Sequence, residues 1–247
     1  MKLSVGFKTD PGPREGLNQD TILAVIPEGR PDAALLIVAD GMGGAKAGEQ
    51  ASREAVRVLQ SYLLDQGLPT HKEAPERLLR AITAANASIH AKGLSSPDME
   101  GMGCTVVVAL VLNDTFWIAS VGDSRAYLVR GEQIYQLTTD HTWVNARVRE
   151  GLLTPEQAAK HSLRHVLDRA LGTKSTVEID VWPDEVLEEG DTLVLCTDGL
   201  YSVLDRRVIA EIASSYPPQE AAVMLVDRAL QAPATDNVSV VVLRAGE

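Results

Sequence analysis

The stretch Ala34-Leu35-Leu36-Ile37-Val38-Ala39-Asp40-Gly41 decides how the rest of the chain is interpreted. Its apolar part is short and unbroken, which is typical of a strand that is buried on both faces. The Asp-Gly pair that follows is typical of a turn, so the strand is expected to enter a loop there. An acidic side chain is therefore expected at the rim of a sheet.

Two amphipathic helices are predicted after this strand. Apolar residues recur at helical spacing within Gly48–Gln66. In the next segment, Pro75 suits the first turn of a helix and Gly93 suits its end. The chain therefore places a pair of helices beside its first buried strand.

The middle of the chain changes to short β-rich segments separated by turn residues such as Asn113-Asp114, which favours an antiparallel meander. Its strands are expected at Cys104–Leu112, Thr115–Val121, Arg125–Arg130 and Gln133–Leu137. Later strands are expected at Val177–Trp182, Thr192–Cys196 and Asn237–Arg244.

A second set of helices is expected in the C-terminal half. Thr154 and Gln157 form a capping pattern, and Arg206–Ala213 and Pro218–Gln231 have helical character. Helices in pairs around a strand-rich middle, without strict alternation of strand and helix, indicate an α+β layered fold. No repeat or linker interrupts the chain, so residues 1–247 are predicted to form a single domain.

Composition excludes several functions. The formal net charge is −11 and no basic cluster stands out, which argues against nucleic acid and anionic membranes as partners. No apolar run is long enough to span a bilayer and Met1–Asp10 lacks a secretory signal, so a cytoplasmic protein is expected. Cys104 and Cys196 lie in strand-like runs without a neighbouring base, which favours two buried thiols over a disulfide, a metal pair or a nucleophile.

Four aspartates stand at strand edges: Asp40, Asp123, Asp198 and Asp236. Each one alone suits an ordinary turn, but together they favour a shared site. Clustered carboxylates are costly without counter-charge, and divalent cations remove that cost. Oxygen ligands without Cys or His indicate Mg2+, Mn2+ or Ca2+ rather than Zn2+, and no acidic loop has the EF-hand pattern.

A pair of such metals is a recurrent device for hydrolysing phosphate esters. The sequence has no Cys-x5-Arg loop, no Gly-x-Ser-x-Gly elbow and no Gly-rich phosphate loop ending in Lys-Ser or Lys-Thr. These absences favour direct attack by a metal-bound hydroxide over a protein nucleophile.

The ordered motifs resemble those of the PP2C-type (PPM) protein phosphatases, in particular the bacterial branch. The motifs are Val38-Ala39-Asp40-Gly41-Met42-Gly43-Gly44, Gly122-Asp123-Ser124-Arg125, Thr197-Asp198-Gly199-Leu200 and Asp236-Asn237-Val238-Ser239. Asn18-Gln19-Asp20 resembles the family's opening motif, and Asp140-His141 the start of its flap. The resemblance covers about the whole chain.

The resemblance implies a central sandwich of two antiparallel β-sheets flanked by pairs of helices, with a flap at about residues 140–165. It implies hydrolysis of phosphoserine and phosphothreonine in proteins by a hydroxide bridging two Mn2+ or Mg2+ ions, opposing bacterial serine/threonine kinases. Asp40 would bridge both ions, the Gly41 carbonyl would bind one, and Asp198 and Asp236 would complete the other site. Asp123 with Asp198 matches the family's weaker third metal site. A monomer is the default expectation.

Other residues are assigned supporting roles by the same resemblance. Asp20 would contact a metal through water or support the metal ligands without binding the metal itself. Gln19 and Asn237 would support the ligands in the same way. Gln19 stands where many relatives have Glu, so weaker binding of the second metal is expected. Arg14 stands one residue before the usual place of the phosphate-binding arginine and is expected to reach the phosphate through a shifted loop.

Two histidines near the flap have more than one possible role. His141 suits either a substrate or protonation role or a capping role, whereas a surface or capping role is favoured for His161. Met42 stands where animal relatives have a candidate acid, so metal-bound water is expected to protonate the leaving hydroxyl.

Two alternative functions remain to be weighed. One is a pseudophosphatase that binds phosphoproteins or kinases without turnover, but no metal aspartate is missing. The other is a phosphatase of anti-sigma-antagonist proteins, which the flap-like segment disfavours because that branch usually looks shorter there.

Overall fold

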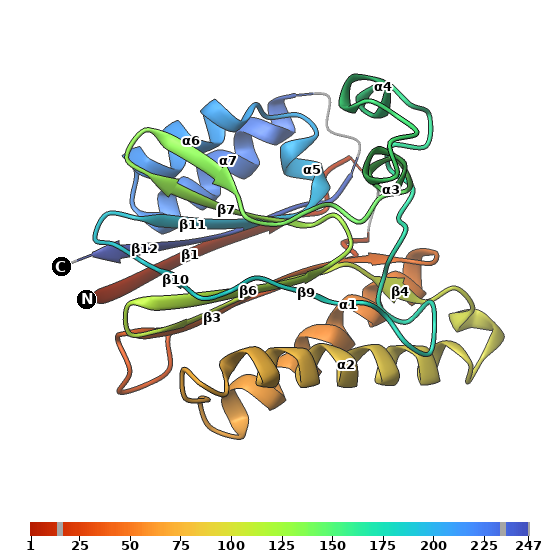
Figure 1. Ribbon diagram of the computed structural model, residues 1–247, viewed down its shortest axis with the longest axis horizontal. Coiled ribbons are helices and arrows are strands. Elements are labelled where there is room, and N and C mark those ends of the chain that lie inside the picture. Colours follow the sequence, from red (N-terminus) through yellow and green to blue (C-terminus); the bar gives the residue numbers. More distant parts are fainter. Residues whose placement is uncertain (14–16, 233–235, 247) are drawn as a thin grey trace.

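Two antiparallel sheets pack face to face in the computed structural model, which describes residues 1–13, 17–232 and 236–246 (Figure 1). The five-stranded sheet has the order β1 (Lys2–Asp10), β12 (Val238–Gly246), β11 (Thr192–Cys196), β7 (Arg125–Arg130) and β8 (Gln133–Gln136). The seven-stranded sheet has the path β10 (Glu185–Val186), β6 (Thr115–Val121), β5 (Val106–Leu112), β3 (Ala33–Met42) and β2 (Asp20–Val25). Two short strands complete it: β4 (Gly103–Cys104) on β3 and β9 (Asp180–Val181) on β6.

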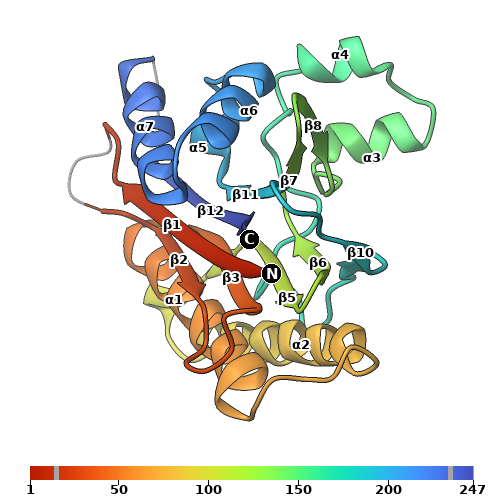
Figure 2. The same cartoon turned by 90° about the vertical axis from the view of Figure 1, so that its left-hand side faces the viewer.

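Helix pairs cover the outer faces of both sheets (Figures 1 and 2). The seven-stranded sheet carries α1 (Ala45–Gln60), which continues as a π-helical turn over Ser61–Asp65, and α2 (Ala74–Gly93). The five-stranded sheet carries α6 (Arg206–Ser215) and α7 (Pro218–Gln231). The expected α+β sandwich with flanking helix pairs is therefore confirmed. None of the described helices combines the length and apolar character needed to cross a membrane.

The decisive strand β3 is buried on both faces, as its unbroken apolar run predicts. Leu35 and Ile37 pack into the core beneath α1 and α2, whereas Leu36 and Val38 pack between the two sheets. A third core cluster lies between the five-stranded sheet and α6 and α7. Alternate residues of one strand thus join two hydrophobic layers, which fixes the register of β3.

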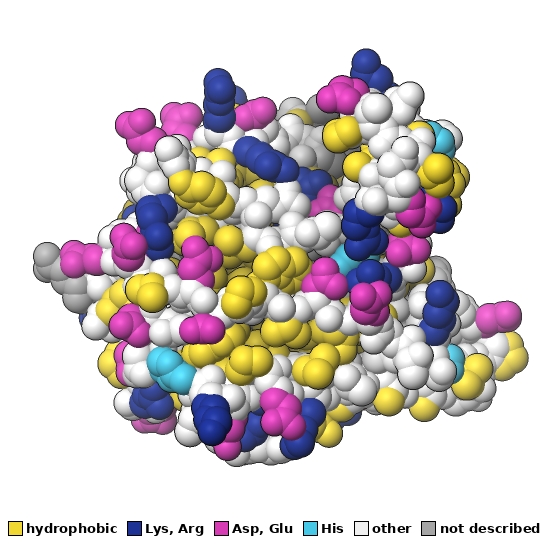
Figure 3. Space-filling model, viewed as in Figure 1, with side chains coloured by type: hydrophobic (Ala, Val, Ile, Leu, Met, Phe, Trp, Pro, Cys, Tyr) yellow, Lys and Arg dark blue, Asp and Glu magenta, His cyan; other side chains and the backbone are white. Residues whose placement is uncertain are grey.

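Short helices lie near the sheet ends. They are the 3-10 turn Pro97–Met99, α3 (Trp143–Arg149), α4 (Pro155–Ala159) and α5 (Asp198–Tyr201). Helices α3 and α4 stand away from the sandwich in Figure 1 and lie in the segment predicted to be a flap. Thr154 and Gln157 form the predicted capping box at the start of α4. On the face shown in Figure 3, charged side chains of both signs are interspersed above and below an apolar band.

Several expected boundaries differ from the structure. The strand predicted over Cys104–Leu112 is broken at Thr105, because the Asp40 N–H bonds to the Thr105 hydroxyl instead of to a backbone carbonyl of that strand. The strand predicted over Val177–Trp182 is reduced to Asp180–Val181, where only two residues of β6 offer partners. The first helix starts at Ala45, directly after two glycines with positive φ, rather than at Gly48.

Candidate functional site

The four predicted aspartates converge at one end of the sandwich. Asp40 lies near the end of β3, Asp123 follows β6, Asp198 begins α5 and Asp236 precedes β12. All four line one cavity of about 280 Å³, together with Gly41 and residues of neighbouring segments. Because β3 and β6 belong to one sheet and the other two aspartates to the opposite one, the cavity exists only when the two sheets pack together.

Asp20 lies directly behind this cluster. It is the first residue of β2 and stands opposite Asp40 in the antiparallel register. The hydroxyl of Thr197 donates to Asp20 Oδ2 over 3.0 Å, whereas Asp20 Oδ1 is buried without a hydrogen-bond partner among the described residues. A buried acceptor of this kind is costly unless a water or cation reaches it.

Burial and mutual repulsion raise the carboxyl pKa values in this cluster. Burial raises the pKa of Asp20 to about 7, against hydrogen bonds from Ser239 and Thr197. Burial, followed by the nearby charges of Asp20 and Asp198, raises the pKa of Asp40 well above its usual range. Burial and then Asp198 raise the pKa of Asp123 to about 7. The cluster therefore lacks positive charge, which divalent cations would supply.

The donors suit hydrated ions with few protein ligands. Within the described part of the chain, no three acidic, His or Cys side chains close around one metal-sized point. Mg2+ ordinarily keeps several waters and takes one or two carboxylates, so carboxylates along the walls of an open cavity match its preference. The oxygen-only donor set, with Asp20 Oδ1 free of partners among the described residues, fits Mg2+ or Mn2+.

Close backbone packing fixes the last residues of β3. A side chain at Gly41 would meet the carbonyl oxygen of Gly48 in α1 at 2.1 Å, so only glycine fits there. The Gly41 N–H donates to the Gln19 carbonyl over 3.1 Å. The start of α1 is thereby pressed against the Asp-Gly pair, which places the Gly41 backbone at the cavity wall.

Gln19 and Asn237 bind the N-terminal loop to the site. The Gln19 N–H donates to Asn237 Oδ1 over 2.9 Å, and Gln19 Nε2 donates to the Gly44 carbonyl over 2.9 Å. Asn237 Nδ2 donates in turn to the carbonyls of Pro11 and Leu17. These contacts match supporting roles behind the aspartates. Arg14, predicted to bind phosphate, lies outside the described residues.

His141 is built into the base of the flap. Its Nδ1 accepts the Gly122 N–H over 3.1 Å, and its Nε2 lies 3.0 Å from Asp180 Oδ2. Burial lowers the pKa of this fully buried imidazole. Of its two possible roles, the structure favours the capping one, since both ring nitrogens face protein groups. His161 accepts the Leu163 N–H through Nδ1 and lies against Trp143, which also matches a capping role.

Three features of the site were not predicted from the sequence. Thr105 contacts the Asp40 backbone, Arg125 forms a bidentate ion pair with Asp140 at the start of the flap, and His165 lines the cavity. A threonine such as Thr105, or an arginine after Gly-Asp-Ser such as Arg125, is too common in sequences to predict these contacts on its own. His165 lies in a loop without periodicity, so only the folded arrangement places it.

Comparison with known proteins points to one family. The family model described as Protein phosphatase 2C matches residues 14–237. The chain is 35% identical over 239 residues to the serine/threonine phosphatase stp of Listeria monocytogenes serotype 4b, covering 96% of this chain and 94% of that protein. It is 33% identical over 246 residues to the protein phosphatase PhpP of Streptococcus pneumoniae, covering 99% and 98%.

Solved structures give the same result. The Mycobacterium tuberculosis serine/threonine phosphatase PstP/Ppp superposes with a TM-score of 0.89 at 33% identity, covering 100% of both chains. The catalytic domain of PstP in complex with two manganese ions superposes with a TM-score of 0.84 at 32% identity, covering 100% of this chain and 99% of that one.

Proposed function

We propose that Asp40, Asp198 and Asp236 form the catalytic centre of this chain, which belongs to the protein phosphatase 2C family and is a metal-dependent serine/threonine protein phosphatase. The observation that carries the proposal is the single cavity that these three aspartates line, with raised carboxyl pKa values around it. Such a cluster is stable when cations share the site.

Each ligand has a specific role in this proposal. Asp40 would bridge two Mn2+ or Mg2+ ions, the Gly41 carbonyl would bind one of them, and Asp198 and Asp236 would hold the other. Asp123 with Asp198 forms a weaker third site. When bound, the ions polarise the phosphoryl oxygens and lower the pKa of water. The buried Asp20 Oδ1 is the acceptor that orients a water behind Asp40.

Supporting residues shape the site around these ligands. Gln19 and Asn237 tether the N-terminal loop to the cavity, and through it Arg14 reaches the phosphate in this proposal. Gln19 brings no charge to the second metal, so that metal binds more weakly than it would beside Glu. The flap, residues 140–165, borders the same cavity through His165.

The finer biological setting is also proposed. Residues 1–247 act as one catalytic domain and a monomer in the cytoplasm, on proteins phosphorylated by serine/threonine kinases. The pseudophosphatase alternative is not favoured, because every metal aspartate is present in the cavity. The narrower alternative of anti-sigma-antagonist substrates has no specific observation in its favour.

The test is phosphate release from a phosphothreonine peptide, with and without Mn2+, by wild type, Asp198→Ala and Arg14→Ala. Activity that needs Mn2+ and is lost in Asp198→Ala supports the metal centre, and a raised KM with retained kcat in Arg14→Ala places that side chain on the phosphate. Wild-type protein that binds Mn2+ by calorimetry yet releases no phosphate would instead support a binding module.

A further inference from the structure

A second cavity lies beside the first, beneath the flap helices. It has a volume of about 280 Å³ and lies between α3, α4 and the end of α5. Asp123 and His165 line both cavities, so the two share a wall. A phosphorylated residue held at the aspartate cluster would therefore place its neighbours in the peptide at the mouth of the second cavity.

Part of this cavity is apolar, beside polar flap residues that include Thr142 and Asn145. Helices α3 and α4 and the first turn of α5 supply the apolar lining: Val144, Val148, Pro155, Ala158, Ala159 and Tyr201. Val144 and Ala158 are buried, whereas Pro155 and Ala159 are exposed at the edge of the cavity. An aliphatic side chain would gain free energy by leaving water for such a surface.

The charged groups of the lining balance one another. The lining holds Asp123 and Asp140 together with Arg125 and Arg164, so their formal charges cancel. Arg125 is already committed to Asp140 through Nε and Nη2 at 2.9 and 2.6 Å. The lining therefore favours a neutral side chain over an acidic or basic one.

The wall beside the aspartate cluster is fixed before any substrate arrives. The Tyr201 hydroxyl donates to the Asp123 carbonyl over 2.9 Å, and the Arg125 guanidinium lies 3.5 Å from the centre of the Tyr201 ring. A preformed wall loses little entropy on binding, which favours a specific contact.

Building on the proposed function, we propose that this cavity binds an aliphatic side chain of the phosphoprotein substrate, from a residue within two positions of the phosphorylated one. An extended peptide advances about 3.3 Å per residue, so such residues lie within about 7 Å of the phosphorylated position. The cavity thus selects substrates by sequence, whereas the aspartate cluster recognises only the phosphate.

The first test uses wild-type protein with Mn2+ and phosphothreonine peptides carrying Leu, Gly, Glu or Lys at each of the two positions on either side. We expect Leu at one position to raise kcat/KM about tenfold over Gly, with Glu and Lys near Gly. A flat profile, or a preference for a charged residue, would overturn the inference. p-Nitrophenyl phosphate, which has no flanking residues, separates the two proposals: if neither it nor any peptide is hydrolysed, the proposed function itself fails.

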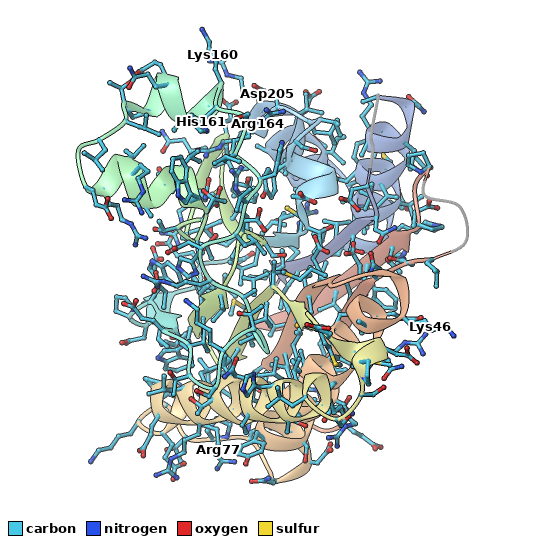
Figure 4. All side chains as sticks on the ribbon, turned by 90° about the vertical axis from the view of Figure 1, so that its right-hand side faces the viewer. Lys46, Arg77, Lys160, His161, Arg164 and Asp205 are labelled. Atoms are coloured by element: carbon cyan, nitrogen blue, oxygen red, sulfur yellow. The ribbon has the colours of Figure 1, made fainter. Side chains whose placement is uncertain are left out.

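The second test places the selectivity in the cavity. Ala159 lines the cavity but is exposed, so Ala159→Leu fills the space without disturbing the core. The Leu-to-Gly ratio of kcat/KM is expected to fall towards one. Lys160→Leu adds the same side chain at the next residue, which points away from the molecule in Figure 4, and is expected to keep the wild-type ratio. An unchanged ratio in Ala159→Leu, or an equal fall in both variants, would show that the selectivity arises elsewhere.

Discussion

Thr105 forms hydrogen bonds with both the carbonyl and the backbone N–H of Asp40. The Thr105 N–H donates to the Asp40 carbonyl over 2.8 Å, and the Thr105 hydroxyl accepts the Asp40 N–H over 3.0 Å. The same hydroxyl lies 2.7 Å from that of Ser124, the neighbour of Asp123. One buried side chain therefore positions Asp40 and links it to the loop of Asp123.

We expect Thr105→Val to weaken metal binding about tenfold, because it keeps the shape of the side chain but frees the Asp40 loop. Leaving a buried N–H unsatisfied also costs about 1–3 kcal/mol of stability. The Mn2+ concentration for half-maximal activity measures the first effect and urea unfolding the second. Thr105→Ser keeps the hydroxyl and is the control; equal Mn2+ requirements in Val and Ser variants would contradict the positioning role.

Metal binding should stabilise the folded protein. A ligand present at about 100 times its dissociation constant adds about 2.7 kcal/mol, which raises the Tm of a chain of this size by about 5–10 °C. Mn2+ is expected to produce this rise in wild type and in Glu132→Gln, an exposed control, but little of it in Asp198→Asn. Differential scanning calorimetry with and without chelator checks this, and an equal rise in Asp198→Asn would place the metal elsewhere.

The contacts of Glu54 predict that the folded protein loses stability in acid. Its buried carboxylate accepts hydrogen bonds from Arg57, Ser88 and Lys92, joining α1 to α2. Led by Arg57, these partners lower the pKa of Glu54 from 4.5 to about 2. A lowered pKa stabilises the fold above pH 4.5, and this contribution disappears as the pH falls towards 2.

The contribution of Glu54 is about 2 kcal/mol at neutral pH, after allowance for solvent around the exposed Arg57 and Lys92 side chains. Glu54→Gln should therefore be less stable than wild type at pH 7 and nearly equal to it at pH 2. Urea unfolding across this range measures the difference. A gap that stays constant with pH would show that the charge of Glu54 is not responsible.

The effects of replacing Arg125 and Asp140 on the free energy of unfolding should be strongly coupled. Both side chains are largely buried, and Arg125→Met leaves the Asp140 carboxylate without its partner, at a cost of about 3 kcal/mol. Adding Asp140→Asn should restore part of that loss. A double-mutant cycle by urea unfolding gives the coupling, with the exposed pair Glu76 and Arg80 as the reference at about 0.5 kcal/mol. Equal coupling in the two pairs would contradict the account.

The sequence predicts the central strand and its acidic end because each is a local pattern. An unbroken apolar run requires burial on both faces. The turn expected at Asp40-Gly41 was wrong, because β3 continues through both residues to Met42 and pairs there with β4. Strands Thr115–Val121, Arg125–Arg130 and Thr192–Cys196 were predicted with their observed bounds for the same reason.

Features that depend on tertiary contacts were not predictable. Strand β1 is stabilised by pairing with β12 at the opposite end of the chain, and the four-residue α5 is too short to have its own periodicity. The position of Asp20 opposite Asp40 depends on the register of β2. His165 reaches the cavity only through the path of the flap.

The most direct test of the metal centre is anomalous diffraction at the manganese edge from crystals grown with Mn2+. The account predicts two strong peaks in the cavity, both beside Asp40, with the Gly41 carbonyl at one and Asp198 and Asp236 at the other. Peaks outside this cavity, or none within it at saturating Mn2+, would contradict the assignment of these aspartates as the ligands of the catalytic metals.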